Sequence, residues 1–323
     1  MPKVRRFDID FIAGLCILHM MWVHAMQLSG LTAHASYQII TAIAGGYMAW
    51  FFFKSGMLYK ESSLKPLIKK LSLKIWLPFV VLSIVALFFE VCYGLFFRQL
   101  IDGEPFSVSR LFLRFFAHTA PSLNLALWFL PCFFFVHVLF AVLRKKMPVL
   151  VIVFIAIFCG TLFDFFHLYR ECFGGSVFFG LFFYSCGVIF KEKQYEAKCL
   201  IMAVIVVVLG IFFPHYISAA TNSMHAGFFY PFGMLVFLGK IFLVDRLFKN
   251  IPEHKSIIAI IGKNAMFCFS LHYFFLAVGR MFVKNIFSEI DGWGMFVAIT
   301  VICVLCLVAV NFGMKKLDIK KYL

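Results

Sequence analysis

Long apolar runs separated by short polar segments are the main pattern along this chain. A bilayer core about 30 Å thick requires roughly 20 apolar helical residues to cross it. A window of that length predicts ten membrane helices, over residues 9–28, 37–59, 76–97, 127–143, 148–165, 173–190, 199–217, 226–245, 257–279 and 293–314. The fourth, fifth and sixth are short, so eight or nine spans are an alternative. No repeat or separate soluble segment interrupts the pattern, which predicts an all-α integral membrane protein with a single domain over 1–323.

Composition excludes a water-soluble globule. Of the 323 residues, 63% are hydrophobic and 14% are charged, whereas soluble domains are about half apolar and about a quarter charged. Length alone would suggest two soluble domains. A single helical bundle in a lipid bilayer accounts for both the length and the composition.

The formal charge of +15 is explained by membrane orientation. Lys3, Arg5 and Arg6 precede the first predicted helix, and further basic clusters follow the second, fourth, sixth, eighth and tenth. Two of the loops on the opposite side, 29–36 and 218–225, contain no Lys or Arg. Positive charge gathers on the cytoplasmic side of membrane proteins. We therefore predict an even number of spans with both termini cytoplasmic, and no nucleic-acid partner.

The connection 98–126 and the cysteines both have structural interpretations. The sequence RLFLRFF, from Arg110, predicts either an amphipathic helix on the membrane surface or a plain loop. The ten cysteines are scattered through apolar runs, and the pair Cys303 and Cys306 has no second pair nearby. Because structural zinc sites require four ligands, we expect no metal.

The first helix carries the most informative polar residues. The run from Ile9 to Met26 includes Asp10, His19 and His24. Ionisable residues inside a membrane helix are costly and by default mark a functional site. At 1.5 Å per residue, His24 lies roughly 20 Å beyond Asp10, in the outer half of the membrane. A spacing of five directs the two histidines to different faces, so they form no metal pair. Hydrogen-bonded packing is the alternative role for each.

Other predicted helices contain polar candidates. Lys54, near the cytoplasmic end of the second, is either a snorkelling lysine or part of an anion site. Trp128 opens the fourth as an expected interfacial anchor, and His272 in the ninth lies about as deep as His24. The remaining intramembrane candidates, each also suited to a structural hydrogen bond, are Glu90, His137 and Asp164.

An ordered set of motifs resembles the acyltransferase 3 family of integral membrane acyltransferases. The motifs are DFIAGLCILHMMWVH, FFFKSGMLY, KIWLPF, LWFLPCFFF, FYSCGVIFKEK and SLHYFFL, and they span nearly the whole chain. The resemblance implies a bundle of about ten helices in a bacterial cytoplasmic membrane. It also implies transfer of an acetyl or other acyl group from cytoplasmic acyl-CoA to a hydroxyl of an extracytoplasmic glycan.

The resemblance also implies roles for single residues. His24 aligns with the family's helix-one histidine, its expected catalytic base. Where members usually have a basic residue before the helix-one glycine, this chain has Ala13 before Gly14. We hypothesise that Lys54 supplies the missing charge for donor binding, with Arg5 and Arg6 as further candidates.

The other predicted site residues complete this scheme. Asp10 is expected to organise the polar residues at the cytoplasmic entrance of the site, so we group it with His24 as catalytic. His272, Trp128 and Glu90 are assigned to the acceptor. One alternative is a glycan translocase or accessory export subunit that performs no acyl transfer. A weaker one is an ion-coupled transporter, because no inverted repeat is present.

Overall fold

A computed structural model describes residues 6–98, 104–166, 174–191, 193–213, 230–254, 256–287 and 289–316, and all regular elements there are helices. The α-helices are α1 (Phe7–Leu28), α2 (Ala35–Ala44), α3 (Tyr47–Met57), α4 (Leu64–Leu71), α5 (Leu77–Phe97), α6 (Val108–His118), α7 (Phe129–Arg144), α8 (Val149–Phe165), α9 (Gly174–Phe190), α10 (Ala197–Phe212), α11 (Tyr230–Phe248), α12 (Ile257–Lys263), α13 (Ala265–Ile286) and α14 (Gly292–Lys316). A π-helical turn, Ser72–Trp76, joins α4 to α5, and the 3-10 helices η2 (Ser122–Trp128) and η4 (Lys193–Tyr195) precede α7 and α10.

Five helical segments of the described chain are long and apolar enough to cross a bilayer. They are Phe7–Leu28, Leu64–Phe97, Ser122–Arg144, Ala265–Ile286 and Gly292–Asn311. Three shorter apolar helices are Val149–Phe165, Gly175–Phe190 and Ala197–Phe212. The all-helical membrane protein expected from the sequence is therefore confirmed. The count of ten spans stays a prediction, as does the cytoplasmic position of the termini.

The predicted helix 37–59 is wrong as one continuous element. It divides into α2 and α3 at Gly45 and Gly46, and Gly46 has a φ of +94°. Glycine adopts this left-handed conformation without the steric cost that a Cβ imposes. Lys240 of α11 donates a 2.5 Å hydrogen bond to the Ala42 carbonyl near the end of α2. The predicted helix 257–279 likewise divides into α12 and α13, at Asn264.

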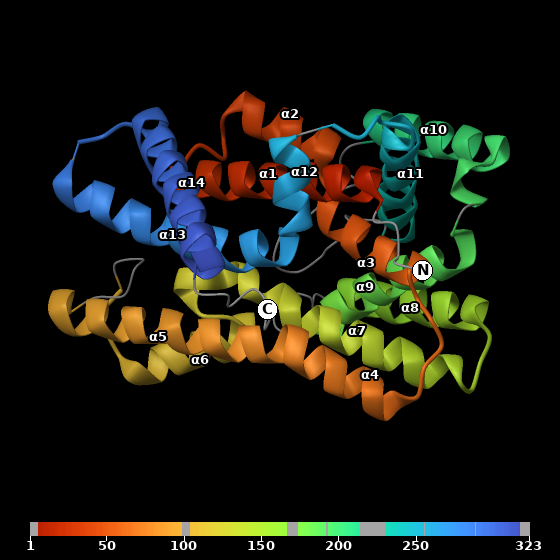
Figure 1. The fold of residues 1–323 in the computed structure, drawn as a ribbon, viewed down its shortest axis with the longest axis horizontal. Coiled ribbons are helices and arrows are strands. Elements are labelled where there is room, and N and C mark those ends of the chain that lie inside the picture. Colours follow the sequence, from red (N-terminus) through yellow and green to blue (C-terminus); the bar gives the residue numbers. More distant parts are fainter. Residues whose placement is uncertain are drawn as a thin grey trace.

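The first helix lies against neighbours from the C-terminal half of the chain. Figure 1 shows α1 passing beside α12, and α1 also packs against α13. A Cβ at Gly14 of α1 would overlap the carbonyl oxygen of Ile258, and one at Gly262 of α12 would overlap that of Asp10. Two glycines thus bring the backbones of α1 and α12 into direct contact.

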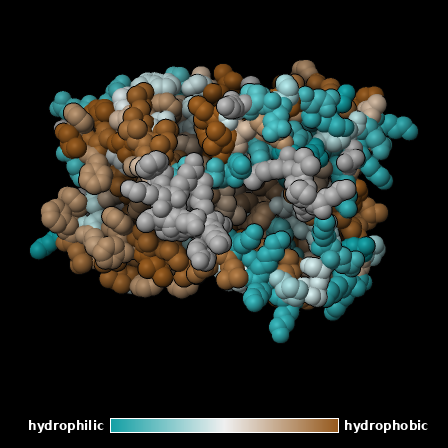
Figure 2. Space-filling model, in the orientation of Figure 1, coloured by the Kyte–Doolittle hydropathy of each residue, from teal (hydrophilic) through white to brown (hydrophobic). Residues whose placement is uncertain are grey.

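The surface of the bundle suits a lipid environment. Large apolar side chains are exposed along α5 and α14, among them Phe88 and Leu305. Figure 2 shows hydrophobic residues over much of the left-hand part, whereas hydrophilic residues gather at the right-hand end, where Figure 1 places the N-terminus. Extensive exposed apolar surface identifies a contact with lipid or another protein. The chain is an integral membrane protein.

The segment RLFLRFF is helical, which confirms the first of its two predicted conformations. It lies within α6, where Leu111 is buried while Phe112, Leu113 and Phe116 are exposed. An amphipathic helix with exposed apolar side chains is typical of the membrane surface. Its depth in the bilayer stays a prediction.

Candidate functional site

Two buried histidines meet between α1 and α13. The rings of His24 and His272 are stacked, with centroids 5.4 Å apart and planes inclined by 29°. His24 is 7% exposed and His272 is fully buried. Tyr273 lies edge-on to His24, with ring centroids 5.0 Å apart. The structure thus brings together two residues that the sequence placed at similar depth in helices far apart along the chain.

Hydrogen bonds define which nitrogen of His272 carries its proton. Nδ1 lies 2.7 Å from the carbonyl oxygen of Phe269 and 3.2 Å from that of Cys268. A carbonyl oxygen only accepts, so Nδ1 is the donor. In the neutral ring Nε2 is then an acceptor, and among the described residues it has no hydrogen-bond partner. This leaves a buried imidazole with an unused acceptor beside His24.

His24 is held by a side chain one turn further along α1. Its Nδ1 lies 2.9 Å from Oε1 of Gln27, while Nε2 of Gln27 donates a 2.9 Å bond to the hydroxyl of Tyr37 on α2. Tyr37 in turn stacks on Trp22, with ring centroids 6.2 Å apart. Because Oε1 accepts, Nδ1 of His24 carries the proton and Nε2 is the acceptor.

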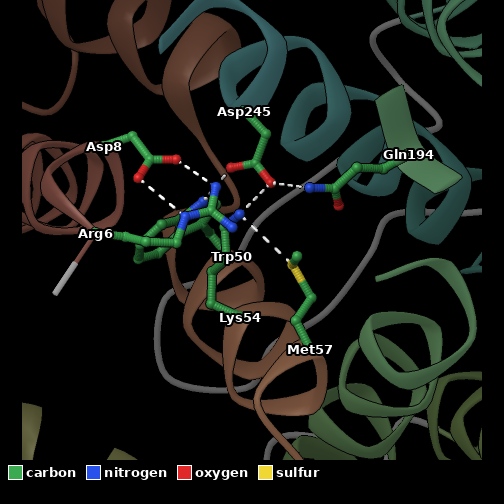
Figure 3. Close-up of polar contacts among 7 residues, drawn as sticks. All are labelled: Arg6, Asp8, Trp50, Lys54, Met57, Gln194 and Asp245. Atoms are coloured by element: carbon green, nitrogen blue, oxygen red, sulfur yellow. Dashed lines mark hydrogen bonds and ion pairs between the residues drawn. The ribbon is translucent and has the colours of Figure 1, made fainter. Parts of the chain in front are cut away.

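A second polar cluster lies at the other end of α1, near its start. Lys54 of α3 forms an ion pair with Asp245 of α11, and both side chains are buried. Asp245 also accepts a 2.9 Å bond from the indole of Trp50 and a 2.8 Å bond from the amide of Gln194 in η4. Figure 3 shows these side chains pointing toward one another, with Met57 beside Lys54. The cluster ties α3, α11 and η4 together.

A second ion pair joins this cluster at the start of α1. Arg6 bonds to Asp8 through Nε at 3.2 Å and a terminal nitrogen at 2.5 Å. The hydrogen bond with Asp8 raises the pKa of Arg6 further above its usual range, and burial raises the pKa of Tyr195 nearby. Arg6 and Lys54 therefore each face a carboxylate, so the two pairs together are electrically neutral.

The residues predicted to act at the cytoplasmic end of the first helix differ in their contacts. Asp8, which was not among the residues predicted from the sequence, is the carboxylate that binds Arg6. Asp10 is half-buried, and its backbone carbonyl lies against Gly262 of α12. Arg5 lies outside the described residues. The roles proposed for Asp10, Arg5 and Arg6 stay predictions.

Glu90 contacts η2 and Trp128 lies in it, and η2 packs against α13 through a 2.8 Å bond from Nδ2 of Asn124 to the Ser270 carbonyl. Glu90 is buried on α5 and accepts a hydrogen bond from the backbone N–H of Leu123, in the first turn of η2. Trp128 is 6% exposed, so its expected position as an interfacial anchor is wrong. Its ring contacts Phe129 at the start of α7. The acceptor-binding roles assigned to both residues stay predictions.

Several functional candidates were missed at the sequence level. Gln27 follows His24 by three residues, a helical spacing that places the two side chains together, so this partner was available to sequence reasoning. Asp245 is an acid in a largely apolar run, a signal of the same kind as Lys54. Gln194 and Tyr37 carry no such signal, because their contacts depend on how η4 and α2 pack.

No group of three or more His, Cys, Asp or Glu side chains within the described ranges is arranged to hold a metal ion. The two polar clusters consist of paired histidine acceptors at one end of α1 and paired charges at the other.

Comparison with known families covers nearly the whole chain. The acyltransferase 3 family model, described as an acyltransferase domain, matches residues 6–312. No curated protein and no solved structure matches the chain significantly. The family match includes both polar clusters and every described transmembrane segment.

Proposed function

Because the chain belongs to the acyltransferase 3 family of integral membrane proteins, we propose that it transfers an acetyl or other short acyl group from acyl-CoA to a glycan. The donor approaches from the cytoplasm, and the accepting hydroxyl lies outside the cytoplasmic membrane of a bacterium. Acyl-CoA is thus a substrate, and the reaction requires no resident metal.

His24 is the general base in this proposal. The observation that supports it is the arrangement of its ring, which is buried, stacked on His272 and bonded through Nδ1 to Gln27. Nε2 is left as a proton acceptor. A neutral imidazole with a free nitrogen is well suited to proton abstraction near neutral pH.

The proposed reaction passes through one tetrahedral intermediate. Nε2 of His24 takes the proton of the glycan hydroxyl while the hydroxyl oxygen attacks the thioester carbonyl. A C–O bond forms, and the carbonyl electrons move to oxygen in a tetrahedral intermediate. When the intermediate collapses, the C–S bond breaks and the leaving thiolate takes the proton from the imidazolium. The ester and free CoA are the products, and His24 is neutral again.

His272 is the proposed acceptor-binding partner. Its Nε2 lacks a partner among the described residues, although the whole side chain is buried. A buried acceptor without a donor costs free energy. A sugar hydroxyl next to the one that reacts would supply that donor and orient the glycan against His24. Trp128 and Glu90 stay our candidates for the wider acceptor region.

Lys54 and Arg6 stay our candidates on the donor side, with Arg5 and Asp10 as neighbours in sequence. The ion pairs of Lys54 with Asp245 and Arg6 with Asp8 bear on this proposal. A CoA phosphate would compete with these carboxylates, so donor binding requires the pairs to open or to share their cations. Relatives usually have a basic residue at the position of Ala13. Lys54 is already paired with Asp245, so it does not simply replace that charge with an unpaired one.

Deletion of the gene in its host, followed by complementation, tests the proposal. Strains carrying wild type or His24→Ala, at matched membrane levels, are analysed for ester-linked acyl groups on surface glycans. We expect intact glycan in all strains and ester only with wild type. Ester at wild-type amounts with His24→Ala would refute the proposed base. Loss of the glycan itself in the deletion strain would favour the glycan translocase.

A further inference from the structure

Gln27 contacts the ring of His24 at Nδ1, on the side opposite the nitrogen that takes the substrate proton. Its side chain lies between His24 on α1 and Tyr37 on α2, with a 2.9 Å hydrogen bond to each. We infer that Gln27 is a positioning residue that keeps the proton of His24 on Nδ1, and that Tyr37 holds the Gln27 side chain against the ring of His24. This inference rests on the proposed function of His24.

The two ends of the Gln27 amide differ chemically, and this difference selects the tautomer. Oε1 only accepts, so facing His24 it requires a proton on Nδ1. If the amide were reversed, its N–H would instead require a lone pair on Nδ1, and the proton would move to Nε2. The reversed arrangement removes the acceptor that takes the substrate proton. Amide orientation therefore decides whether neutral His24 is a competent base.

Tyr37 supplies a second contact that holds the Gln27 side chain beside His24. Its hydroxyl accepts the bond from Nε2 of Gln27 at 2.9 Å. The ring of Tyr37 is stacked on Trp22 of α1, with planes inclined by 22°. This stacking holds α2 in register with the part of α1 that carries both His24 and Gln27. The three contacts form one chain from an aromatic pair to the reactive imidazole.

His272 is stacked on His24, so the tautomer of His24 decides whether the two rings together present one acceptor nitrogen or two. Nδ1 of His272 donates to the Phe269 carbonyl, so Nε2 of His272 is also an acceptor. With Gln27 in the observed orientation, the two stacked rings both present an acceptor nitrogen. Two acceptors can receive two substrate hydroxyls, one for reaction and one for binding. A rotated amide would leave only the binding nitrogen.

Two substitutions at one position separate positioning from packing. Gln27→Met keeps the length of the side chain but accepts no strong hydrogen bond, so kcat should fall about 10- to 100-fold, part of the contribution of a general base. Gln27→Glu only accepts, so it keeps the proton on Nδ1 and should preserve most of kcat. Its negative charge holds a second proton on the ring more tightly, so the acidic limb of the kcat profile should move to higher pH.

The experiment uses the full-length protein in membranes, with labelled acetyl-CoA as the donor probe and surface glycan as the acceptor. Gln38→Met is the matched control, because Gln38 is exposed on α2 and its side chain takes no part in the hydrogen bonds that join His24, Gln27 and Tyr37. We expect Gln38→Met to behave as wild type, Gln27→Met to lose kcat with an unchanged KM, and Gln27→Glu to shift the pH profile. Tyr37→Phe should give a smaller loss of kcat than Gln27→Met.

The outcomes distinguish this inference from the function on which it rests. If His24→Ala is inactive while Gln27→Met has a wild-type kcat and pH profile, the inference on Gln27 fails and the base stands. If His24→Ala retains wild-type transfer, the proposed base fails first. Should Gln27→Met not accumulate in the membrane, the pH profile of Gln27→Glu decides, and an unshifted profile overturns the inference.

Discussion

The carboxylate of Asp245 on α11 pairs with the ammonium of Lys54 on α3 in the interior of the molecule. Removing one partner of a buried ion pair leaves an uncompensated charge, which costs about 3–5 kcal/mol. Lys54→Met and Asp245→Asn should each lower the free energy of unfolding by about that amount, and the double variant should recover most of it. Denaturation in detergent measures this effect. Lys60→Met, at an exposed lysine, is the control, and losses no larger than its own would contradict the prediction.

The same double variant tests the donor role of Lys54 apart from its structural role. Lys54→Met with Asp245→Asn removes the cation but restores neutrality, so the fold should remain intact. If Lys54 binds a donor phosphate, the KM for acyl-CoA should rise about tenfold, the size of a lost charged hydrogen bond. Transfer assays at varied donor concentration measure it. A wild-type donor KM in a folded double variant would remove Lys54 from the donor site.

The contact between Gly14 on α1 and Gly262 on α12 leaves no room for a methyl group. A Cβ on either glycine would overlap a backbone carbonyl, which cannot rotate away. Gly14→Ala and Gly262→Ala should therefore each destabilise the protein by about 1–3 kcal/mol or more. At Gly279 an added Cβ would meet only the Ile302 side chain, at 3.3 Å. Gly279→Ala is thus the control, and equal melting temperatures for all three variants would contradict the close approach of α1 and α12.

Two substitutions of Glu90 distinguish a role in stabilising the fold from a role in binding the acceptor. Its carboxylate accepts a hydrogen bond from the Leu123 backbone at the start of η2. Glu90→Gln retains an acceptor for that bond, whereas Glu90→Leu leaves the buried N–H unpaired, at a cost of about 1–3 kcal/mol. We expect Glu90→Gln to remain stable and Glu90→Leu to unfold at a lower temperature. Full stability of Glu90→Gln with loss of acceptor binding would instead support the role predicted from the sequence.

His272→Phe tests the proposed acceptor contact. Phenylalanine retains an aromatic ring against His24 but has no nitrogen acceptor, so the acceptor KM should rise about tenfold, the size of one lost hydrogen bond. The donor KM should not change. His137→Phe is the matched control, since Nδ1 of His137 also bonds a carbonyl of its own helix, at 2.8 Å from Phe133. An unchanged acceptor KM in His272→Phe would contradict the role of His272.

The sequence predicts the broad architecture because hydrophobicity over 20 residues is a local signal. It correctly indicates a helical membrane protein and places His24 and His272 at similar depth. It does not show the break at Gly45 and Gly46, because two glycines in an apolar run do not alter a hydropathy window. The division of α2 from α3 depends on the left-handed φ of Gly46 and on Lys240, which lies on a distant helix.

The site is only partly predictable from the sequence, because several of its hydrogen bonds and ion pairs join residues of different helices. Lys54 is recognisable as a buried cation, but the sequence does not show that Asp245 neutralises it. Gln27 was accessible through its spacing from His24 within one helix. Tyr37 and Gln194 were not, because their hydrogen bonds exist only after α2 and η4 have packed.

The most direct measurement of the central claim is acyl transfer in everted membrane vesicles supplied with labelled acetyl-CoA. Wild type is compared with His24→Ala and with His19→Ala, which removes a second histidine from the same helix. The ring of His19 lies against Tyr47, 5.0 Å between centroids, and its spacing from His24 directs it to another face of α1. We predict label in glycan for wild type and His19→Ala, and only background for His24→Ala. Wild-type labelling by His24→Ala would contradict the account.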